Sequence, residues 1–276
     1  MSAQPATESP EFEIEQPKFE QPDLGQQEFG QPEFDHLVHC VPDVESAVRG
    51  YTEAGLPAHA NPEYLGYRNG AWRLDARYIE LSSIVNRLVF LDSPYGRAMR
   101  DWQPRADELV ARGGGALVFC VHVTDAGATA ERLRARGHGV ELLTFAREGS
   151  PVSFREAILT DGPPWAPFFV TYEPDRQTIL AKYSAGRVNR GPHDLAGILI
   201  ETPDPRASAD WLGELLGIPL GASPTVVPLP LGQVHFTEGP ADAITALLLS
   251  GGGPPTTVIN GLAVRPVESV TGPAQT

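Results

Sequence analysis

Two side chains stand out as candidates for chemistry because each lies in an otherwise apolar run. His36 lies in residues 34–41, whose alternation predicts a half-buried strand. Glu80 lies 44 residues later in Tyr-Ile-Glu-Leu, within a second predicted strand over residues 77–84. A half-buried carboxylate is costly unless a cation, a metal ion or a hydrogen-bond donor satisfies it. Histidine and glutamate also serve as general acids and bases, so these two residues are the first candidates for a site.

The strand that carries His36 opens a pattern that occurs three times. In each copy an apolar strand leads to an aspartate at a helix N-cap, then to about a dozen helical residues and a terminating glycine. The three aspartates are Asp43, Asp125 and Asp204, which are 82 and then 79 residues apart. The sequence therefore predicts three structural units of similar length.

The three copies differ where His36 stands. Val118 occupies that position in the second copy and Gly197 in the third. His122, further along the second strand, and Glu173, near the end of the last strand of the second unit, are more typical of solvated strand ends than of ligands. We therefore expect any chemistry to lie in the first unit.

Further elements follow from apolar periodicity and from glycine and proline punctuation. The predicted helices cover residues 44–54, 92–111 (irregular), 125–136 and 205–216, and further strands are predicted at 66–74, 116–123, 139–146, 153–159, 167–173, 223–229, 233–237, 242–249 and 256–265.

Composition bounds the class of protein. The chain has 276 residues, 41% of them apolar, which is enough for a well-buried core. The sequence contains no run of eighteen apolar residues of the kind that predicts a membrane span. Its acidic start does not resemble a signal peptide. Cys40 and Cys120 lie in apolar strands and are expected to be buried thiols, in keeping with a cytoplasmic location. A net charge of −14 argues against nucleic acid and anionic membranes as partners, which leaves a small-molecule ligand and a possible homodimer.

Residues 1–33 form an acidic, Pro/Gln-rich segment that we predict to be a disordered arm. They hold eight acidic side chains against Lys18 alone and show no helical or strand period. The alternative is that Phe12, Phe19 and Phe29 dock onto a partner or cover the protein's own pocket.

The order of these parts resembles a known superfamily. A unit of strand, helix and three strands that opens with Asp-His-Leu-Val and closes with Tyr-Ile-Glu-Leu is similar to the βαβββ module of the vicinal oxygen chelate superfamily, and specifically to its glyoxalase-like domains. The resemblance covers residues 34–265. It implies an α+β fold in which repeated modules form cupped, mainly antiparallel sheets. We assign modules to residues 34–112, 113–190 and 191–266, the last divergent, followed by a loose tail at 267–276.

The resemblance also implies a ligand set. In the superfamily, the positions of His36 and Glu80 project into the cup and bind a divalent metal such as Zn, Mn, Fe or Mg. His122 is a tentative third ligand. The departures at Val118 and Gly197 leave a protein without a metal equally plausible, because catalytic metal sites usually take three protein ligands.

Without a metal, His36 and Glu80 would act as a base and its partner. Arginine at the third position of Gly66-Tyr67-Arg68-Asn69, where related domains often have histidine, favours anion binding over metal binding. The residues available to line a substrate pocket are Tyr67, Arg68, Trp72, Arg73, Tyr78 and Trp165.

These observations predict an enzyme with lyase or isomerase chemistry that transfers a proton on a carbonyl-containing small molecule, using His36 and Glu80 with or without a metal. The alternative is a protein that binds or sequesters a small molecule, as a drug-resistance protein does, without transforming it.

Overall fold

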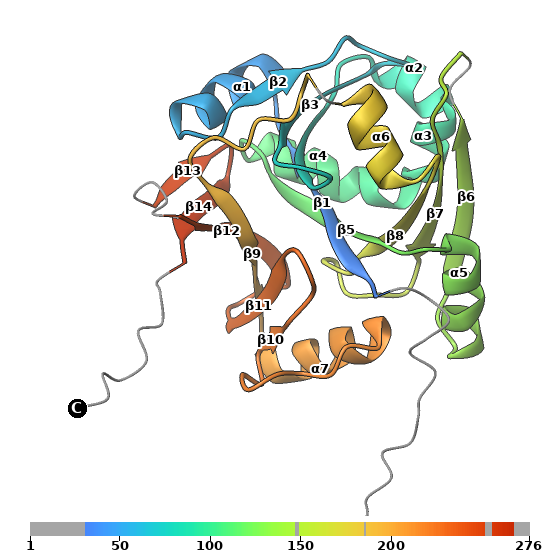
Figure 1. Cartoon of the computed structure of the whole chain (residues 1–276), viewed down its shortest axis with the longest axis vertical. Helices are drawn as coiled ribbons and strands as arrows, with labels where there is room; N and C mark the ends of the chain where they lie inside the picture. The colour runs from blue at the N-terminus through green and yellow to red at the C-terminus, as the bar shows by residue number, and fades with distance from the viewer. Residues whose placement is uncertain (1–30, 147–148, 185, 252–255, 268–276) are drawn as a thin grey trace, which may run out of the picture.

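The computed structural model describes residues 31–146, 149–184, 186–251 and 256–267. Its strands and helices form two mixed sheets with helices on their faces (Figure 1). The predicted α+β class with mainly antiparallel pairing is confirmed. The predicted arm over residues 1–33, with its three phenylalanines, lies outside the described residues except for its last three positions, as does nearly all of the tail.

The first two units together build one eight-stranded sheet in the order β2-β3-β4-β1-β5-β8-β7-β6. Strand β1 pairs antiparallel with β5 at the centre, and each of these strands pairs parallel with the last strand of its own unit. The bounds are β1 Glu33–Cys40, β2 Ala58–Ala60, β3 Tyr67–Arg73, β4 Tyr78–Ile84, β5 Gly115–His122, β6 Val140–Ala146, β7 Ser153–Leu159 and β8 Phe168–Glu173.

One helix follows the opening strand of each unit. Helix α1 (Val44–Glu53) begins where Asp43 accepts a hydrogen bond from the Ser46 backbone, and α5 (Ala126–Ala135) begins in the same way at Asp125. Both helices bury their apolar residues in the core that covers the outer face of the sheet. The N-cap aspartates read from the sequence therefore mark the true helix starts.

The third predicted unit forms a separate six-stranded sheet in the order β10-β11-β9-β12-β14-β13. Strand β9 pairs parallel with β11 and antiparallel with β12, and β12 pairs parallel with β14, so the pairing around β9 and β12 repeats that around β1 and β5 with fewer strands. The bounds are β9 Asp194–Thr202, β10 Val226–Val227, β11 Gln233–Glu238, β12 Ala243–Ser250, β13 Thr257–Ile259 and β14 Leu262–Pro266.

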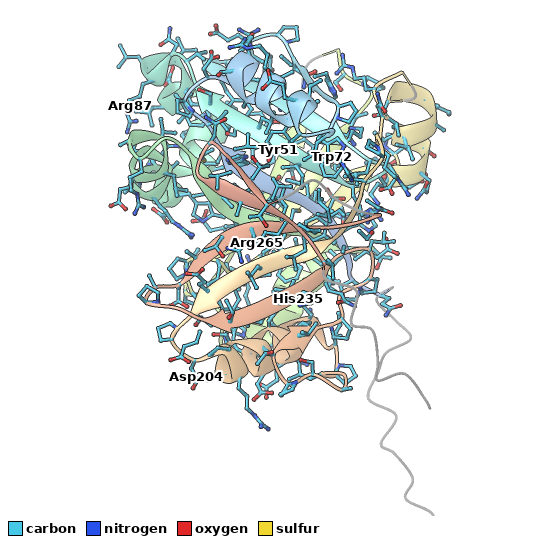
Figure 2. The ribbon with its side chains drawn as sticks, turned by 90° about the vertical axis from the view of Figure 1, so that its left-hand side faces the viewer. Tyr51, Trp72, Arg87, Asp204, His235 and Arg265 are labelled. Atoms are coloured by element: carbon cyan, nitrogen blue, oxygen red, sulfur yellow. The ribbon has the colours of Figure 1, made fainter. Side chains whose placement is uncertain are left out.

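Helix α7 (Pro205–Leu216) packs on the six-stranded sheet through its apolar face. It begins at Asp204, with Pro205 in its first turn, and ends at Gly217, whose φ of 69° is a left-handed conformation that suits glycine. In Figure 2, Asp204 and His235 lie in this smaller half of the molecule, and Tyr51 and Trp72 lie inside the larger half.

A connecting segment covers the inner, cupped face of the large sheet. It comprises α2 (Arg87–Asp92), α3 (Pro94–Ala98), the short 3-10 helix η1 (Arg100–Trp102) and α4 (Gln103–Ala111). Met99, Trp102 and Ala106 from this segment pack with Val38 and Val118 of the sheet in a second apolar cluster. We call this inner face of the sheet, together with the segment that packs on it, the cup.

The short strand β2 and helix α6 (Arg176–Tyr183) were not anticipated from the sequence. Helix α6 has almost no apolar side that would mark it by periodicity, and it begins where Asp175 caps the backbone of Gln177 and Thr178. Within the described residues, no helix is long and apolar enough to cross a membrane.

His39 joins the two sheets. It is fully buried, its Nε2 donates to the backbone oxygen of Asn260 at 2.9 Å, and its Nδ1 accepts from the Tyr51 hydroxyl at 2.9 Å. Because a carbonyl oxygen only accepts, the ring is held neutral with its proton on Nε2. Burial lowers the pKa of His39 to about 4.

This burial predicts a loss of stability in mild acid. Between about pH 6.5 and 4, His39 binds a proton in the unfolded chain but stays unprotonated in the folded chain. The free energy of unfolding should therefore fall, as the pH is lowered through this window, by about 3 kcal/mol more in the wild type than in His39→Gln. Urea denaturation at a series of pH values measures the difference, and parallel profiles for the two proteins would contradict it.

Candidate active site in the cup

A bulge in β1 places two neighbouring side chains in the cup. The register between β1 and β5 shifts between Phe34 and His36, so Asp35 has no partner in the ladder. In a regular strand Asp35 and His36 would point to opposite faces. Here the carboxylate of Asp35 instead accepts a hydrogen bond from His36 Nδ1 at 2.7 Å. The bulge thus turns a dipeptide into an aspartate–histidine pair.

Asp35 is fully buried and held by partners from the second unit. Its Oδ1 also accepts from the Tyr172 hydroxyl at 2.8 Å, and its Oδ2 pairs with Arg176 at 3.1 Å. Burial by itself favours the neutral acid, but the hydrogen bond and charge of His36, together with Arg176, hold the pKa of Asp35 below its usual value. Arg176 also pairs with Glu33. Asp35 is therefore an ionised hydrogen-bond acceptor.

The imidazole of His36 is fixed from three sides. It stacks on Tyr78 with ring centroids 4.5 Å apart and meets the edge of Phe168 at 5.4 Å, while Asp35 accepts its Nδ1–H. Because an ionised carboxylate only accepts hydrogen bonds, the neutral ring carries its lone pair on Nε2. This atom lies 3.9 Å from Oε2 of Glu80. Nε2 is thus the free, basic end of the pair.

Glu80 faces His36 from the neighbouring strand β4, where it stands two residues beyond the partner of His36 in the ladder. Its Oε1 accepts hydrogen bonds from the Tyr67 hydroxyl at 2.5 Å and from Asn69 Nδ2 at 2.9 Å, both on β3. Burial and the charge of Glu80 raise the pKa of Tyr67, so the phenol keeps its proton and donates. Only Oε2 of the carboxylate is left to act on a ligand.

The pair is shielded from water without being sealed. The side chain of His36 keeps 6% of its surface exposed and that of Glu80 keeps 16%. Charges at this depth interact strongly because little water screens them. A ligand that reached Nε2 would meet a nearly dry environment.

A third carboxyl group, Glu156, lies on the cup face of β7. Its strand neighbours Phe154 and Ile158 and its ladder partners Val170 and Leu143 all belong to the apolar cluster of the cup. Part of the residue reaches solvent, but the crowded apolar surroundings lower its hydration. Among the described residues, Glu156 makes no hydrogen bond or ion pair. Burial, followed by the negative charges of Glu80 and Asp35, raises its pKa to about 8.

The donors in the cup do not fit a metal held by both units. The positions of the second unit that correspond to His36 and Glu80 are Val118 and Phe168, by the ladder pairings of β1 with β4 and of β5 with β8. Neither side chain can bind a metal. The first unit then offers a metal only His36 Nε2 and Glu80 Oε2, whereas catalytic metal sites usually have three protein ligands.

A different trio of potential ligands gathers within 4.8 Å in the described part of the chain, namely Asp35, His36 and Cys120. Its donors are already committed or protonated. Both oxygens of Asp35 are hydrogen-bonded, with the Arg176 cation beside them, and burial raises the pKa of the Cys120 thiol well above its usual value. A metal ligand must be deprotonated, so this trio does not fit a metal either.

The structure brings some of the predicted pocket residues to the pair. Tyr67 and Tyr78 contact Glu80 and His36 directly, and the Arg73 guanidinium lies over the Tyr78 ring, 4.1 Å from its centroid. His122, the tentative metal ligand, stacks on Tyr172 at 6.3 Å and belongs to no ligand group with His36.

Three of the predicted pocket residues lie elsewhere. Arg68 pairs with Glu45 of α1 and donates to Asn61. Trp72 is fully buried in the core on the other face of β3, because alternation along that strand separates it from Tyr67. Trp165 is fully buried and its Nε1 donates to Asp242 at 3.1 Å, towards the six-stranded sheet. These three positions are therefore structural.

Sequence reasoning missed five residues of the site: Asp35, Asn69, Glu156, Tyr172 and Arg176. Asp35 was visible as part of Asp-His, but regular alternation would place it on the strand face opposite His36, and a bulge leaves no mark in the residue pattern. Glu156 shares its strand face with Phe154 and Ile158, and that alternation was the signal available.

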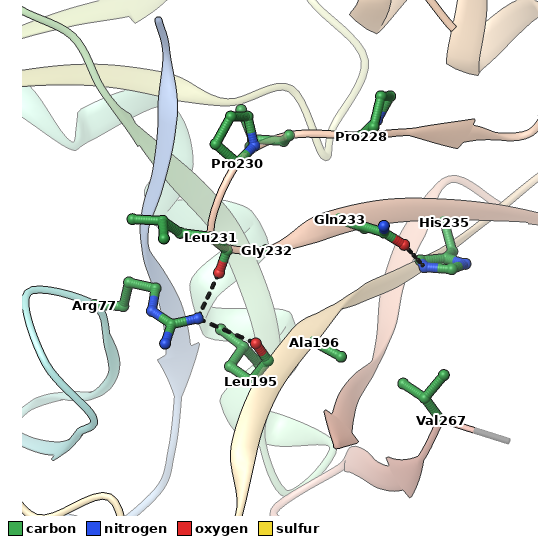
Figure 3. A pocket seen from close by; sticks show the side chains of 11 residues that line it. Arg77, Leu195, Ala196, Pro228, Pro230, Leu231, Gly232, Gln233, His235 and Val267 are labelled. Carbon is green, nitrogen blue, oxygen red and sulfur yellow. Dashed lines mark hydrogen bonds between the residues drawn. The ribbon is translucent and has the colours of Figure 1, made fainter. Parts of the chain in front are cut away.

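A surface pocket outside the cup lies where the two sheets meet (Figure 3). Arg77 donates there to the backbone oxygens of Leu195 at 3.1 Å and Leu231 at 2.6 Å, and His235 Nε2 lies 3.1 Å from Gln233 Oε1. These polar groups are already paired. The Arg77 hydrogen bonds join the two sheets, and the pocket does not add to the candidate site.

Known proteins resemble this chain in family and fold. The model of a family described as a glyoxalase-like domain matches residues 34–216. A hypothetical protein from Staphylococcus aureus is 14% identical with a TM-score of 0.65, over 86% of this chain and 100% of that one. No curated protein sequence matches.

Two solved enzymes resemble the chain less closely. A Mn(II)-bound glyoxalase from Novosphingobium aromaticivorans is 13% identical with a TM-score of 0.46, over 79% of this chain and 65% of that one. Homoprotocatechuate 2,3-dioxygenase from Arthrobacter globiformis is 14% identical with a TM-score of 0.46, over 79% and 63%. At these identities the likeness concerns the fold.

The raised pKa of Glu156 predicts how stability changes in base. Between about pH 4.5 and 8 the unfolded chain releases a proton that the folded chain keeps, so the free energy of unfolding falls as the pH rises through this window. Each displaced pKa unit corresponds to about 1.4 kcal/mol. Glu156→Gln should therefore be more stable than the wild type at pH 8 by a few kcal/mol, and this advantage should shrink towards pH 4.5.

Denaturation midpoints at several pH values measure this effect. Glu141→Gln, at an exposed position on the adjacent strand β6, is the matched control and should follow the wild type. An advantage of Glu156→Gln that did not change with pH would contradict the burial of an acid at this position.

Proposed function

Because the chain belongs to the glyoxalase-like domain family, we propose that it is an enzyme that moves a proton next to a carbonyl group of a small-molecule substrate, with His36 as the base. The reaction class is isomerisation or elimination. Proteins that share this fold catalyse several different reactions, so the reaction class must be inferred from the residues of the site.

One observation carries the proposal. Asp35 holds His36 by Nδ1 and leaves Nε2 directed towards Glu80 at 3.9 Å, inside a cup that excludes most water. This pairing fixes the tautomer and the orientation of a base, and the buried carboxylate stabilises the imidazolium that forms when the base takes a proton. A merely structural histidine would have both nitrogens occupied, as His39 does.

In the proposed step, Nε2 of His36 takes the proton from the carbon beside the carbonyl. The electron pair of the broken C–H bond passes into the carbonyl to form an enolate. Return of the proton from His36 to the same or a neighbouring carbon gives an isomer, and departure of a group from the adjacent carbon gives an elimination product. Both hydrogen bonds to Glu80 go to its Oε1. Within the described residues, its Oε2 accepts no hydrogen bond and is available as a second acceptor beside Nε2.

The arrangement keeps the surrounding phenols as donors. Burial and neighbouring negative charges raise the pKa values of Tyr67, Tyr78 and Tyr172, so these groups stay protonated at neutral pH. Tyr67 holds Glu80 and Tyr172 holds Asp35, and none of the three phenols competes with His36 for the substrate proton.

A binding role without turnover is the second candidate function, and one observation favours it. Tyr78, Phe168 and Trp102 form a continuous aromatic contact around His36, with Phe168 and Trp102 centroids 5.6 Å apart. Such aromatic walls are typical of sites that hold apolar ligands. The exchange experiment below separates the two roles.

Exchange with solvent deuterium tests the proposal before the natural substrate is known. A panel of small ketones and hydroxyketones is incubated with the protein in D2O, and loss of the proton beside the carbonyl is followed by NMR. The wild type should catalyse exchange, and His36→Gln should lower the rate by about 10²–10⁴-fold, the usual contribution of a general base. Asp35→Asn should lower it as well, because the ring loses its orienting acceptor.

His235→Gln, on the far sheet, is the control and should keep the wild-type rate. Exchange that survived in His36→Gln would refute the assignment of the base. Compounds that bind to the wild type and never exchange would instead support the binding role.

Removal of metals is a separate prediction. Since the first unit offers one nitrogen and one oxygen donor and the second unit offers Val118 and Phe168 at the matching positions, dialysis against EDTA should leave the exchange rate unchanged. Elemental analysis of the purified protein checks the same point. One equivalent of Mn or Zn per chain, together with loss of exchange on chelation, would show the donor argument to be wrong.

A further inference from the structure

The carboxamide of Gln103, the first residue of α4, has no partner. Gln103 is 5% exposed, and in the described part of the protein neither its Oε1 nor its Nε2 makes a hydrogen bond. A buried amide that loses water without gaining a partner destabilises the fold. Such groups are rare in native proteins, and each one calls for an explanation.

Helical geometry directs Gln103 towards the cup. Residues three and seven positions further along a helix share its face, and these are Ala106 and Val110, both of which pack in the apolar cluster of the cup. The preceding residue, Trp102, meets Phe168, which in turn meets His36. The unpaired amide therefore belongs to the cover of the same space that the catalytic pair faces.

Glu156 is a second unpaired polar group in this space, and it comes from the sheet side. It lies among Phe154, Ile158 and Val170, which belong to the same cluster as Ala106 and Val110. Its raised pKa keeps it protonated at neutral pH, so it presents a hydroxyl donor. Gln103 on the covering segment and Glu156 on the sheet thus both lie beside residues of the same apolar cluster.

We propose that Gln103 and Glu156 bind the substrate, and that this substrate is a neutral hydroxycarbonyl compound. The inference rests on the proposed proton transfer and specifies its substrate class. An amide supplies an N–H donor and a carbonyl acceptor side by side, and the complementary ligand offers a carbonyl oxygen next to a hydroxyl. The hydroxyl of Glu156 provides a further donor to an oxygen of the ligand.

The carboxyl groups of Asp35 and Glu80 beside His36 favour a neutral compound over an anion. Asp35 is ionised, and Glu80 adds a second carboxyl group beside His36. The Arg176 cation is already paired with Asp35 and Glu33. These negative charges would repel an anionic ligand, and little water is present to screen the repulsion. An anion would therefore bind more weakly than a neutral compound.

Ligand-observed NMR with hydroxyacetone as the neutral probe and glycolate as its anionic counterpart tests the proposal. The wild type should bind hydroxyacetone saturably in the millimolar range expected of so small a ligand, and should bind glycolate at least about tenfold more weakly, a difference that one unfavourable charge contact supplies. Gln103→Leu and Gln103→Met should each weaken hydroxyacetone binding about tenfold or more. Gln177→Leu, at an exposed position on α6, is the matched control and should bind as the wild type does.

Thermal unfolding of the free proteins supplies a readout that needs no ligand. Replacing an unpaired buried amide by an apolar side chain of similar size should raise the Tm by a few degrees, by about 2–4 °C for each kcal/mol recovered. A lower Tm in both Gln103 variants would overturn the proposal, because it would mean that ordered water already satisfies the amide. Unchanged binding in both variants, stronger binding of glycolate, or no saturable hydroxyacetone binding up to about 100 mM would overturn it as well.

Binding to His36→Gln separates this proposal from the function on which it rests. If His36→Gln loses deuterium exchange but still binds hydroxyacetone, and the Gln103 variants do not bind it, both proposals hold. If the wild type binds the probe without exchange and the Gln103 variants bind it at least about tenfold more weakly, substrate recognition by Gln103 stands and the proton-transfer proposal fails.

Discussion

The buried charge of Asp35 is the constraint on which the rest of the site depends. A carboxylate with no exposed surface persists only if its surroundings supply donors and opposite charge. Here they come from three elements: His36 on the same strand, Tyr172 on β8 and Arg176 at the start of α6. The contacts that stabilise the Asp35 charge connect the two units of the large sheet, and they also orient the His36 ring.

The two units of the sheet are alike in backbone and unlike in chemistry. Their opening strands pair antiparallel at the centre, and each has its closing strand parallel beside it. The first unit supplies His36 and Glu80 at the positions where the second supplies Val118 and Phe168. The second unit contributes through other positions, with Tyr172 and Arg176 supporting Asp35 and Phe168 fixing the imidazole edge. One unit thus carries His36 and Glu80, and the other holds His36 in position.

The connecting segment that covers the cup also combines two kinds of residue, apolar ones and an unpaired polar one. The connecting segment supplies apolar surface from Met99, Trp102 and Ala106, and this surface shields His36 and Glu80 from most water. It also places Gln103 where no protein group satisfies it. A fold optimised only for stability would have an apolar residue there, so the unpaired amide is a cost that a ligand can offset.

The resemblance to a known superfamily implied the α+β class and brought His36 and Glu80 together, whereas the sequence by itself determined the repeated units, their capped helices and the strands that carry these two residues. These features rest on periodicity, N-cap aspartates and glycine stops, which are local and readable one residue at a time. Tertiary structure alone decided that Asp35 turns into the cup, that Arg176 and Tyr172 reach it, and that Arg68, Trp72 and Trp165 do not line the site. A bulge, an ion pair between residues 141 positions apart and the choice of strand face depend on contacts between distant segments, and no local pattern encodes them.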